Sequence, residues 1–136
     1  MKEQFTKTDY GWELERSQLL FMGKQVAIDV DTKIDAKAPD QDIFDGQIAT
    51  LRIILAQWEV FAVKIEKEIL AYEGISETEL RRVANLPRIY LSLDDITHQP
   101  LENQQWSFTL GVNESEDFGW HVEFKGEKYL ETWAGG

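Results

Sequence analysis

The chain has 136 residues, 43% of them apolar and 12% aromatic, which is typical of a folded domain and not of a disordered segment. Its 14 lysines and arginines face 25 aspartates and glutamates, and the net charge of −11 disfavours nucleic acid and anionic membrane surfaces as partners. The absence of cysteine excludes disulfides, thiolate nucleophiles and sulfur-ligated zinc. We therefore expect a single domain over residues 1–136, and its negative charge favours a basic protein as partner.

The start of the chain and its hydropathy bear on location. The segment MKEQFTKTDYGW lacks the apolar core of a secretory signal, and no stretch approaches the roughly 20 apolar residues that cross a membrane. A chain without cysteine also suits a reducing compartment. We therefore expect a cytoplasmic protein.

Extended structure is expected at the start of the domain, because apolar and charged residues alternate in short runs over residues 10–34. Two or three strands fit there, separated at Gly23 and Lys24. Six aspartates then fall within the seventeen residues 29–45, around Pro39, a composition typical of a solvated connection. This connection is expected to lead into a helix.

The strongest periodic signal in the chain follows. Apolar residues recur every three or four positions from Phe44 to Tyr72, and Gly74 supplies a helix stop. A helix of about 27 residues would be about 40 Å long at 1.5 Å per residue and would span the domain. Ile54 and Phe61 widen the apolar stripe, which favours packing on a sheet over a narrow coiled-coil seam.

A short second helix and further strands complete the predicted fold. Ser76 and Glu79 have the spacing of a capping box, and Pro87 requires the helix to end before it. Strands are expected in RIYLSL and WSFTLGV, and then in a hairpin of GWHVEF and KYLETW that turns near Gly126. The predicted class is α+β: an antiparallel sheet of about five to seven strands packed against one long helix and one short helix.

Two histidines are the first candidates for chemistry. His98 and His121 are 23 residues apart, far from the i, i+4 spacing of a helical metal site, so a histidine metal centre is not expected. His121 has acidic neighbours and is a candidate general base. Strand alternation, however, places it with Glu123 and Lys125 on the face opposite Trp120, which is also the pattern of a solvated sheet face.

The segment DQDIFDG resembles the start of a calcium loop, but its third acid and its glycine come one residue late, and the twelfth position is Leu51. Asp40, Asp42 and Asp45 are therefore expected to cap the long helix and to keep the connection solvated. The chain contains no phosphate-binding glycine motif and no nucleophile elbow. We predict a non-enzymatic protein with no metal and no cofactor.

Three segments together resemble a known group of proteins. They are QIATLRIILAQWEVFAVKIEKEILAYEG, SETELRRVANLPRIYLSL and WSFTLGVNESEDFGWHVEFKGEKYLETWAG, and their order is similar to that of small bacterial α+β domains of unknown function. Some of those domains resemble immunity proteins of bacterial toxin systems, which bind and neutralise a toxin. In the closing turn Asp117 and Gly119 fit the pattern of the group, while Phe118 stands where that pattern has histidine. The resemblance implies protein binding and transfers no catalytic residue.

We therefore expect a cytoplasmic binding domain of the immunity type, whose acidic surface meets a basic partner such as a toxin. Most aromatic residues near the C-terminus suit the core, and one or two are expected to face outwards and to contribute to binding. One alternative is a small enzyme or ligand-binding domain that uses His121 with nearby carboxylates, and another is a structural homodimer. The candidate partner-binding residues are Glu114, Glu116, Asp117, Trp120, His121 and Glu123.

Overall fold

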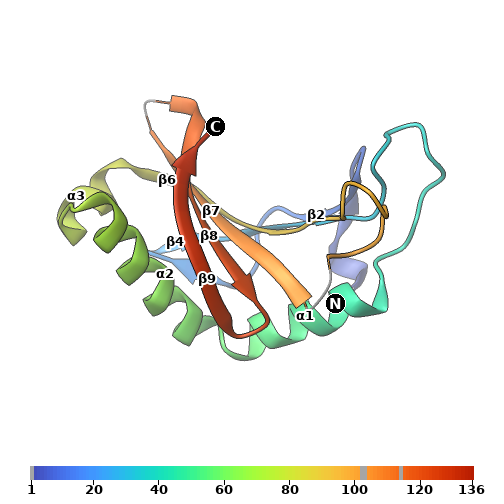
Figure 1. Ribbon diagram of the computed structural model, residues 1–136, viewed down its shortest axis with the longest axis horizontal. Helices are drawn as coiled ribbons and strands as arrows, with labels where there is room; N and C mark the ends of the chain where they lie inside the picture. Colours follow the sequence, from blue (N-terminus) through green and yellow to red (C-terminus); the bar gives the residue numbers. More distant parts are fainter. Residues whose placement is uncertain (1, 102–103, 114) are drawn as a thin grey trace.

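The computed structural model of the chain describes residues 2–101, 104–113 and 115–136. Its centre is a seven-stranded sheet with helices along one side (Figure 1). In spatial order the strands are β1 (Thr6–Lys7), β2 (Gly11–Leu14), β5 (Ala27–Asp31), β6 (Ala84–Leu91), β7 (Gln105–Val112), β8 (Ser115–Lys125) and β9 (Lys128–Gly135). The other elements are the hairpin of β3 (Leu20–Phe21) and β4 (Lys24–Gln25), and the helices η1 (Lys2–Gln4), α1 (Asp45–Ala56), α2 (Trp58–Glu73) and α3 (Glu77–Val83).

The predicted α+β class and the predicted number of strands are confirmed, but the sheet is not wholly antiparallel. Strands β5 and β6 run parallel, with Ile28 opposite Ile89 and Val30 opposite Leu91. Parallel neighbours need a long crossover connection, and the loop and helices between β5 and β6 provide it. The other neighbours in the sheet pair antiparallel.

The prediction of one long helix is wrong in one respect: the helix is divided at Gln57, and α1 and α2 meet at an angle (Figure 1). Gln57 has φ −125° and ψ 22°, outside the helical range. Its side-chain amide donates to the Glu127 carboxylate, in the turn between β8 and β9. The neighbouring Trp58 indole N–H donates to the Leu20 carbonyl oxygen, 2.8 Å away. These two bonds fasten the bend to two separate hairpins.

The bend also changes which apolar residues reach the core. Leu55 and Tyr72 belong to the predicted stripe, yet they are 40% and 50% exposed. The apolar residues of α1 and α2 that are buried are Leu51, Ile54, Trp58, Phe61, Ile65 and Ile69.

None of the helices in the described ranges is long and apolar enough to cross a membrane.

Aromatic side chains from the C-terminal strands fill the space between sheet and helices. The Trp106 and Phe124 rings stack with centroids 4.4 Å apart, and the Phe61 ring meets both of them edge-on, at 5.0 and 5.3 Å. The prediction that most of these aromatics form the core is confirmed. Phe118 and Trp133, each 39% exposed, are the ones near the C-terminus that face outwards.

The short helix is confirmed as α3, and it ends before Pro87 as predicted. The Ser76 hydroxyl oxygen accepts a hydrogen bond from the Glu79 backbone N–H at 3.2 Å, which is one half of the predicted capping box. The other half is replaced, because the Glu79 carboxylate accepts from the Arg82 guanidinium.

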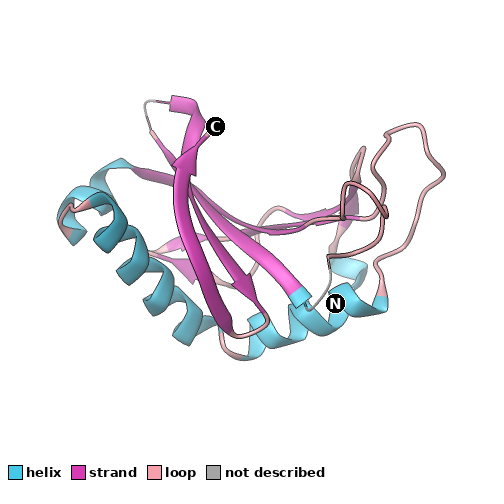
Figure 2. Cartoon of the chain, viewed as in Figure 1, coloured by secondary structure: helices cyan, strands magenta, loops and turns pink. Residues whose placement is uncertain are grey.

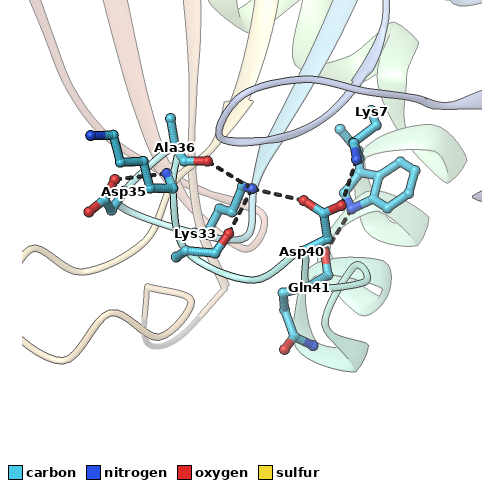
Figure 3. Close-up of polar contacts among 9 residues, drawn as sticks. Lys7, Lys33, Asp35, Ala36, Asp40 and Gln41 are labelled. Atoms are coloured by element: carbon cyan, nitrogen blue, oxygen red, sulfur yellow. Dashed lines mark hydrogen bonds and ion pairs between the residues drawn. The ribbon is translucent and has the colours of Figure 1, made fainter.

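The aspartate-rich loop between β5 and α1 is organised by a lysine (Figure 3). The Lys33 ammonium donates to the carbonyl oxygens of Ala36 and Ala38, at 3.2 and 3.0 Å, and lies 2.8 Å from the Asp40 carboxylate. Lys7 in β1 pairs with the same carboxylate at 2.5 Å. The prediction that Asp40 caps the helix is therefore wrong, since this carboxylate lies before the first turn and is held by two ammonium groups.

Replacing Lys33 by alanine should loosen this loop. The change removes three hydrogen bonds, so we expect the free energy of unfolding to fall by about 1 kcal/mol and the amides of residues 34–43 to exchange faster. Hydrogen bonds from Lys33, in the first place, and from Lys7 lower the pKa of Asp40 to about 2. In the variant this pKa should rise towards 3.8. Lys37→Ala, at an exposed position in the same loop, is the control. Equal exchange rates in the two variants would contradict the assignment.

Candidate functional site

One face of the sheet packs on the helices, and in the described ranges no helix packs on the other face (Figure 2). Side chains alternate between the two faces of each strand, so the open face carries the polar positions. The register aligns these positions in rows that cross the strands. One row holds Glu13, Asp29, Tyr90, Ser107, Glu123 and Glu131, and the next holds Arg88, Thr109, His121 and Trp133.

A trough of about 460 Å³ runs along β7 on this face. Its floor consists of small residues of β7, namely Ser107, Thr109 and Gly111. Larger side chains flank Ser107 and Thr109 on both sides, because the partners of these two residues on β6 and β8 are long or aromatic. The wall on β6 is formed by Arg88 and Tyr90, and the wall on β8 by His121 and Glu123.

At one end of the trough, glycines leave the surface of the sheet free of side chains. Gly111, Gly119 and Gly135 are opposite one another on β7, β8 and β9. A Cβ atom on Gly119 would lie 2.8 Å from the Leu110 carbonyl oxygen, closer than real contacts allow. The half-exposed Phe118 ring also lines this end.

The wall on β6 is built around an ion-pair network. The Arg88 guanidinium lies 2.8 Å from the Glu13 carboxylate and 2.6 Å from the Asp29 carboxylate, and all three side chains are 20 to 27% exposed. Burial raises the pKa of Asp29, and the bond from Arg88 opposes that shift. Burial also raises the pKa of Tyr90, and the negative charge of Asp29 adds to this shift. Two carboxylates and one guanidinium leave this wall with one negative charge in excess.

The opposite wall combines an aromatic stack with a carboxylate. The His121 and Trp133 rings are parallel within 7°, with centroids 3.8 Å apart. The Trp133 indole N–H donates to a Glu123 oxygen at 3.2 Å, and His121 Nε2 lies 3.3 Å from the Gly135 carbonyl oxygen. Burial raises the pKa of Glu123, although the bond from Trp133 and the nearby His121 act in the other direction. No lysine or arginine among the described residues pairs with this carboxylate.

Asp31 adds another half-buried carboxylate to the open face, two positions beyond Asp29 on β5. Burial and the negative charge of Asp29 raise the pKa of Asp31 from 3.8 to about 6. Within the part of the chain that the structure describes, the Asp31 carboxylate has neither an ion-pair partner nor a hydrogen-bond donor. As far as the structure describes the chain, the open face therefore holds two half-buried carboxylates, on Asp31 and Glu123, that lack a cation.

Of the candidate residues predicted from the sequence, the structure places His121 and Glu123 together on the trough wall. Trp120 is 2% exposed and lies on the helix side, so its side chain is not available to a partner. Glu114 lies outside the described residues. The backbone of Glu116 and Asp117 belongs to β8, but their side chains are not described.

The trough also contains residues that the sequence analysis did not single out. Arg88 and Tyr90 come from RIYLSL, and Ser107 and Thr109 from WSFTLGV. Alternation along a strand, which was applied to His121, would have placed Arg88 with Tyr90 on one face of the first segment and Ser107 with Thr109 on one face of the second. Nothing in the sequence, however, indicated that these two strands would flank each other and form one site.

Other places on the molecule offer less chemistry. A hollow of about 540 Å³ lies at the bend between α1 and α2, where Leu20, Leu55 and Val60 dominate and Glu59 is the ionisable group. Within residues 2–101, 104–113 and 115–136, no three or more histidine, aspartate and glutamate side chains come together as a metal site. The trough is therefore the candidate site.

These features define an α+β domain with one covered and one open, polar sheet face. No known protein family, no curated protein and no solved structure matches the chain.

Replacing Asp31 by asparagine should stabilise the fold at neutral pH. The pKa of Asp31 is about 6 in the folded protein, whereas an ordinary aspartate, as in the unfolded chain, has a pKa of 3.8. Protonated Asp31 therefore contributes its full stabilisation below about pH 4, and this contribution is lost as the pH rises through 6. The variant should therefore exceed the wild type by about 1 kcal/mol at pH 8, after allowance for solvent screening, and by much less at pH 4.

Urea unfolding at several pH values measures this difference. Asp9→Asn, at an exposed position in the turn before β2, is the control and should show no such trend. A constant difference between wild type and Asp31→Asn from pH 4 to 8 would show that Asp31 titrates as an ordinary aspartate.

Proposed function

We propose that the protein is a non-enzymatic binding domain that receives a basic protein partner on the open face of its sheet. Some of the small bacterial domains that the sequence resembles are similar to immunity proteins, and on that resemblance we propose that the partner is a bacterial toxin and that the domain neutralises it in the cytoplasm. The net charge of −11 supports the choice of a basic partner, because complementary charge accelerates encounter.

One observation supports the proposal: the open face contains half-buried carboxylates that no cation of the described residues pairs with. Holding Glu123 and Asp31 in this environment raises the pKa of each, so their ionised forms destabilise the free protein. A cationic partner would remove this penalty by pairing with them. Ionisable groups whose charged form is unfavourable in the free protein and is stabilised in a complex are typical of binding sites.

A second candidate function, a small enzyme, is supported by the presence of His121 and Glu123 on one wall. The geometry favours it less than binding. His121 Nε2 lies 3.3 Å from the Gly135 carbonyl oxygen and the ring stacks on Trp133, and no hydrogen bond joins His121 to Glu123. The carbonyl oxygen can hold the tautomer that has its proton on Nε2, but the pairing of His121 with a carboxylate, on which this alternative depends, is not formed.

The binding proposal predicts that filling the trough blocks the partner. Thr109→Trp adds a large side chain to the floor while strand structure is retained, and it should weaken the complex at least tenfold, which is about 1.4 kcal/mol. Gln105→Trp is the matched control, because position 105 is on the same strand and face but outside the trough. It should change the affinity less than about threefold.

Calorimetry with the purified product of a neighbouring toxin gene, at low and high salt, measures these affinities, and survival of toxin-expressing cells measures neutralisation. The wild type should bind more weakly at high salt. Lack of protection by the wild type, or equal affinities for wild type and Thr109→Trp, would overturn the proposal.

A further inference from the structure

We infer that the trough over β7 receives an arginine side chain of the partner, with its guanidinium against the Glu123 carboxylate. This inference rests on the proposed function and specifies the group that the partner supplies. The shape of the trough, its charge and its unused hydrogen-bonding groups each support it.

The shape of the trough limits what can enter it. Its walls on β6 and β8 are two strand spacings apart, which is roughly 9.5 Å between backbones. Side chains such as Tyr90 and His121 narrow this space further. An α-helix with its side chains is about 10 to 12 Å wide, so it cannot reach the floor. A single long side chain can reach Ser107 and Thr109.

The charge of the trough favours a cation at both walls. Glu123 carries a negative charge, and in the described part of the chain only the Trp133 indole N–H donates to it, which leaves its second oxygen free. Arg88 does not repel an incoming cation strongly, because its charge is more than balanced by Glu13 and Asp29. An anionic ligand would have to approach both Glu123 and this excess negative charge.

The unused groups in the trough match a guanidinium better than an ammonium. Among the described residues, the hydroxyls of Tyr90, Ser107 and Thr109 have no hydrogen-bond partner, so several acceptors surround one space. Arginine offers five N–H donors in one plane, whereas lysine offers a compact and strongly hydrated charge with three. The planar group can also stack on the His121 ring, whose other face is taken by Trp133.

An NMR titration of the ¹⁵N-labelled full chain tests this assignment. The probe is Nα-acetyl-arginine methylamide, and the comparison probes are the corresponding lysine and citrulline compounds. We expect saturable shifts of the Trp133 indole N–H and of amides in residues 107–111 and 121–123, with a dissociation constant of about 1 to 10 mM for so small a ligand. Lysine should bind at least about threefold more weakly, and neutral citrulline should cause no saturable shift.

Two variants locate the effect. Glu123→Gln should weaken arginine binding at least tenfold, or about 1.4 kcal/mol, because it removes the charge but keeps the shape. Glu131→Gln is the matched control: Glu131 is opposite Glu123 on β9, yet it does not line the trough. It should change the affinity less than about twofold. The dispersion of the ¹⁵N spectrum shows that each variant is folded.

Equal binding of the arginine and citrulline probes, or unchanged binding in Glu123→Gln, would overturn the inference. With the partner protein, the two proposals fail in different ways. If Thr109→Trp abolishes the complex but Glu123→Gln leaves it intact, the open face is the interface and the arginine assignment is wrong. If both variants bind the partner like the wild type, the proposed function itself is wrong.

Discussion

The register between β7 and β8 is the constraint on which the candidate site depends. Trp106 is opposite Phe124 and Phe108 is opposite Val122, and all four side chains are buried. The Trp106 indole N–H also donates to the Gly126 carbonyl oxygen at 2.9 Å, which fixes the tip of the hairpin relative to β7. A slip of one residue would turn these groups to solvent and would bury the floor of the trough, at a prohibitive cost in lost apolar burial. The core therefore determines which polar groups share the open face.

On the open face, stability and the proposed binding of a partner make opposite demands. A sheet face without a helix loses the apolar burial that stabilises the covered face, and here it also holds carboxylates in a partly desolvated position. The Arg88 network limits this cost on one wall, because each of its carboxylates has a cation at hydrogen-bond distance. From the ranges that the structure describes, Glu123 receives only the indole N–H of Trp133. A partner that supplies the missing cation makes the two demands compatible.

Features that depend on local periodicity were predictable from the sequence. The alternation in GWHVEF correctly placed His121 and Trp120 on opposite faces, because a strand obeys a period of two wherever one of its faces is buried, but it did not decide which of the two faces outwards, and Trp120 was wrongly included among the binding residues. The Ser76 cap and the end of the short helix were also predictable, since both depend on neighbouring residues. The break at Gln57 was not, because glutamine is a good helix former and its anchor, Glu127, is 70 residues away.

The site could be predicted only in part for the same reason. Arg88 pairs with residues 75 and 59 positions earlier, and one sequence gives no sign of which strands become neighbours. The aspartates before α1 were assigned to the nearest element, although the partner of Asp40 is Lys33 within the loop and Lys7 on another strand. Residue type alone thus identified the groups capable of chemistry, and tertiary structure decided which of them meet.

The parallel pairing of β5 with β6 has a consequence for the order of folding. Asp29 and Arg88 can approach only after the whole crossover has been made and ordered, because closing so long a loop is entropically unfavourable until the helices pack. During synthesis, β5 leaves the ribosome well before β6, so the acidic residues of the N-terminal strands are solvated and unpaired at first. The complete trough requires β8 as well, and a nascent chain that lacks its last hairpin cannot present it. If the trough is the binding site that we propose, binding competence is acquired late, when nearly the entire domain has emerged.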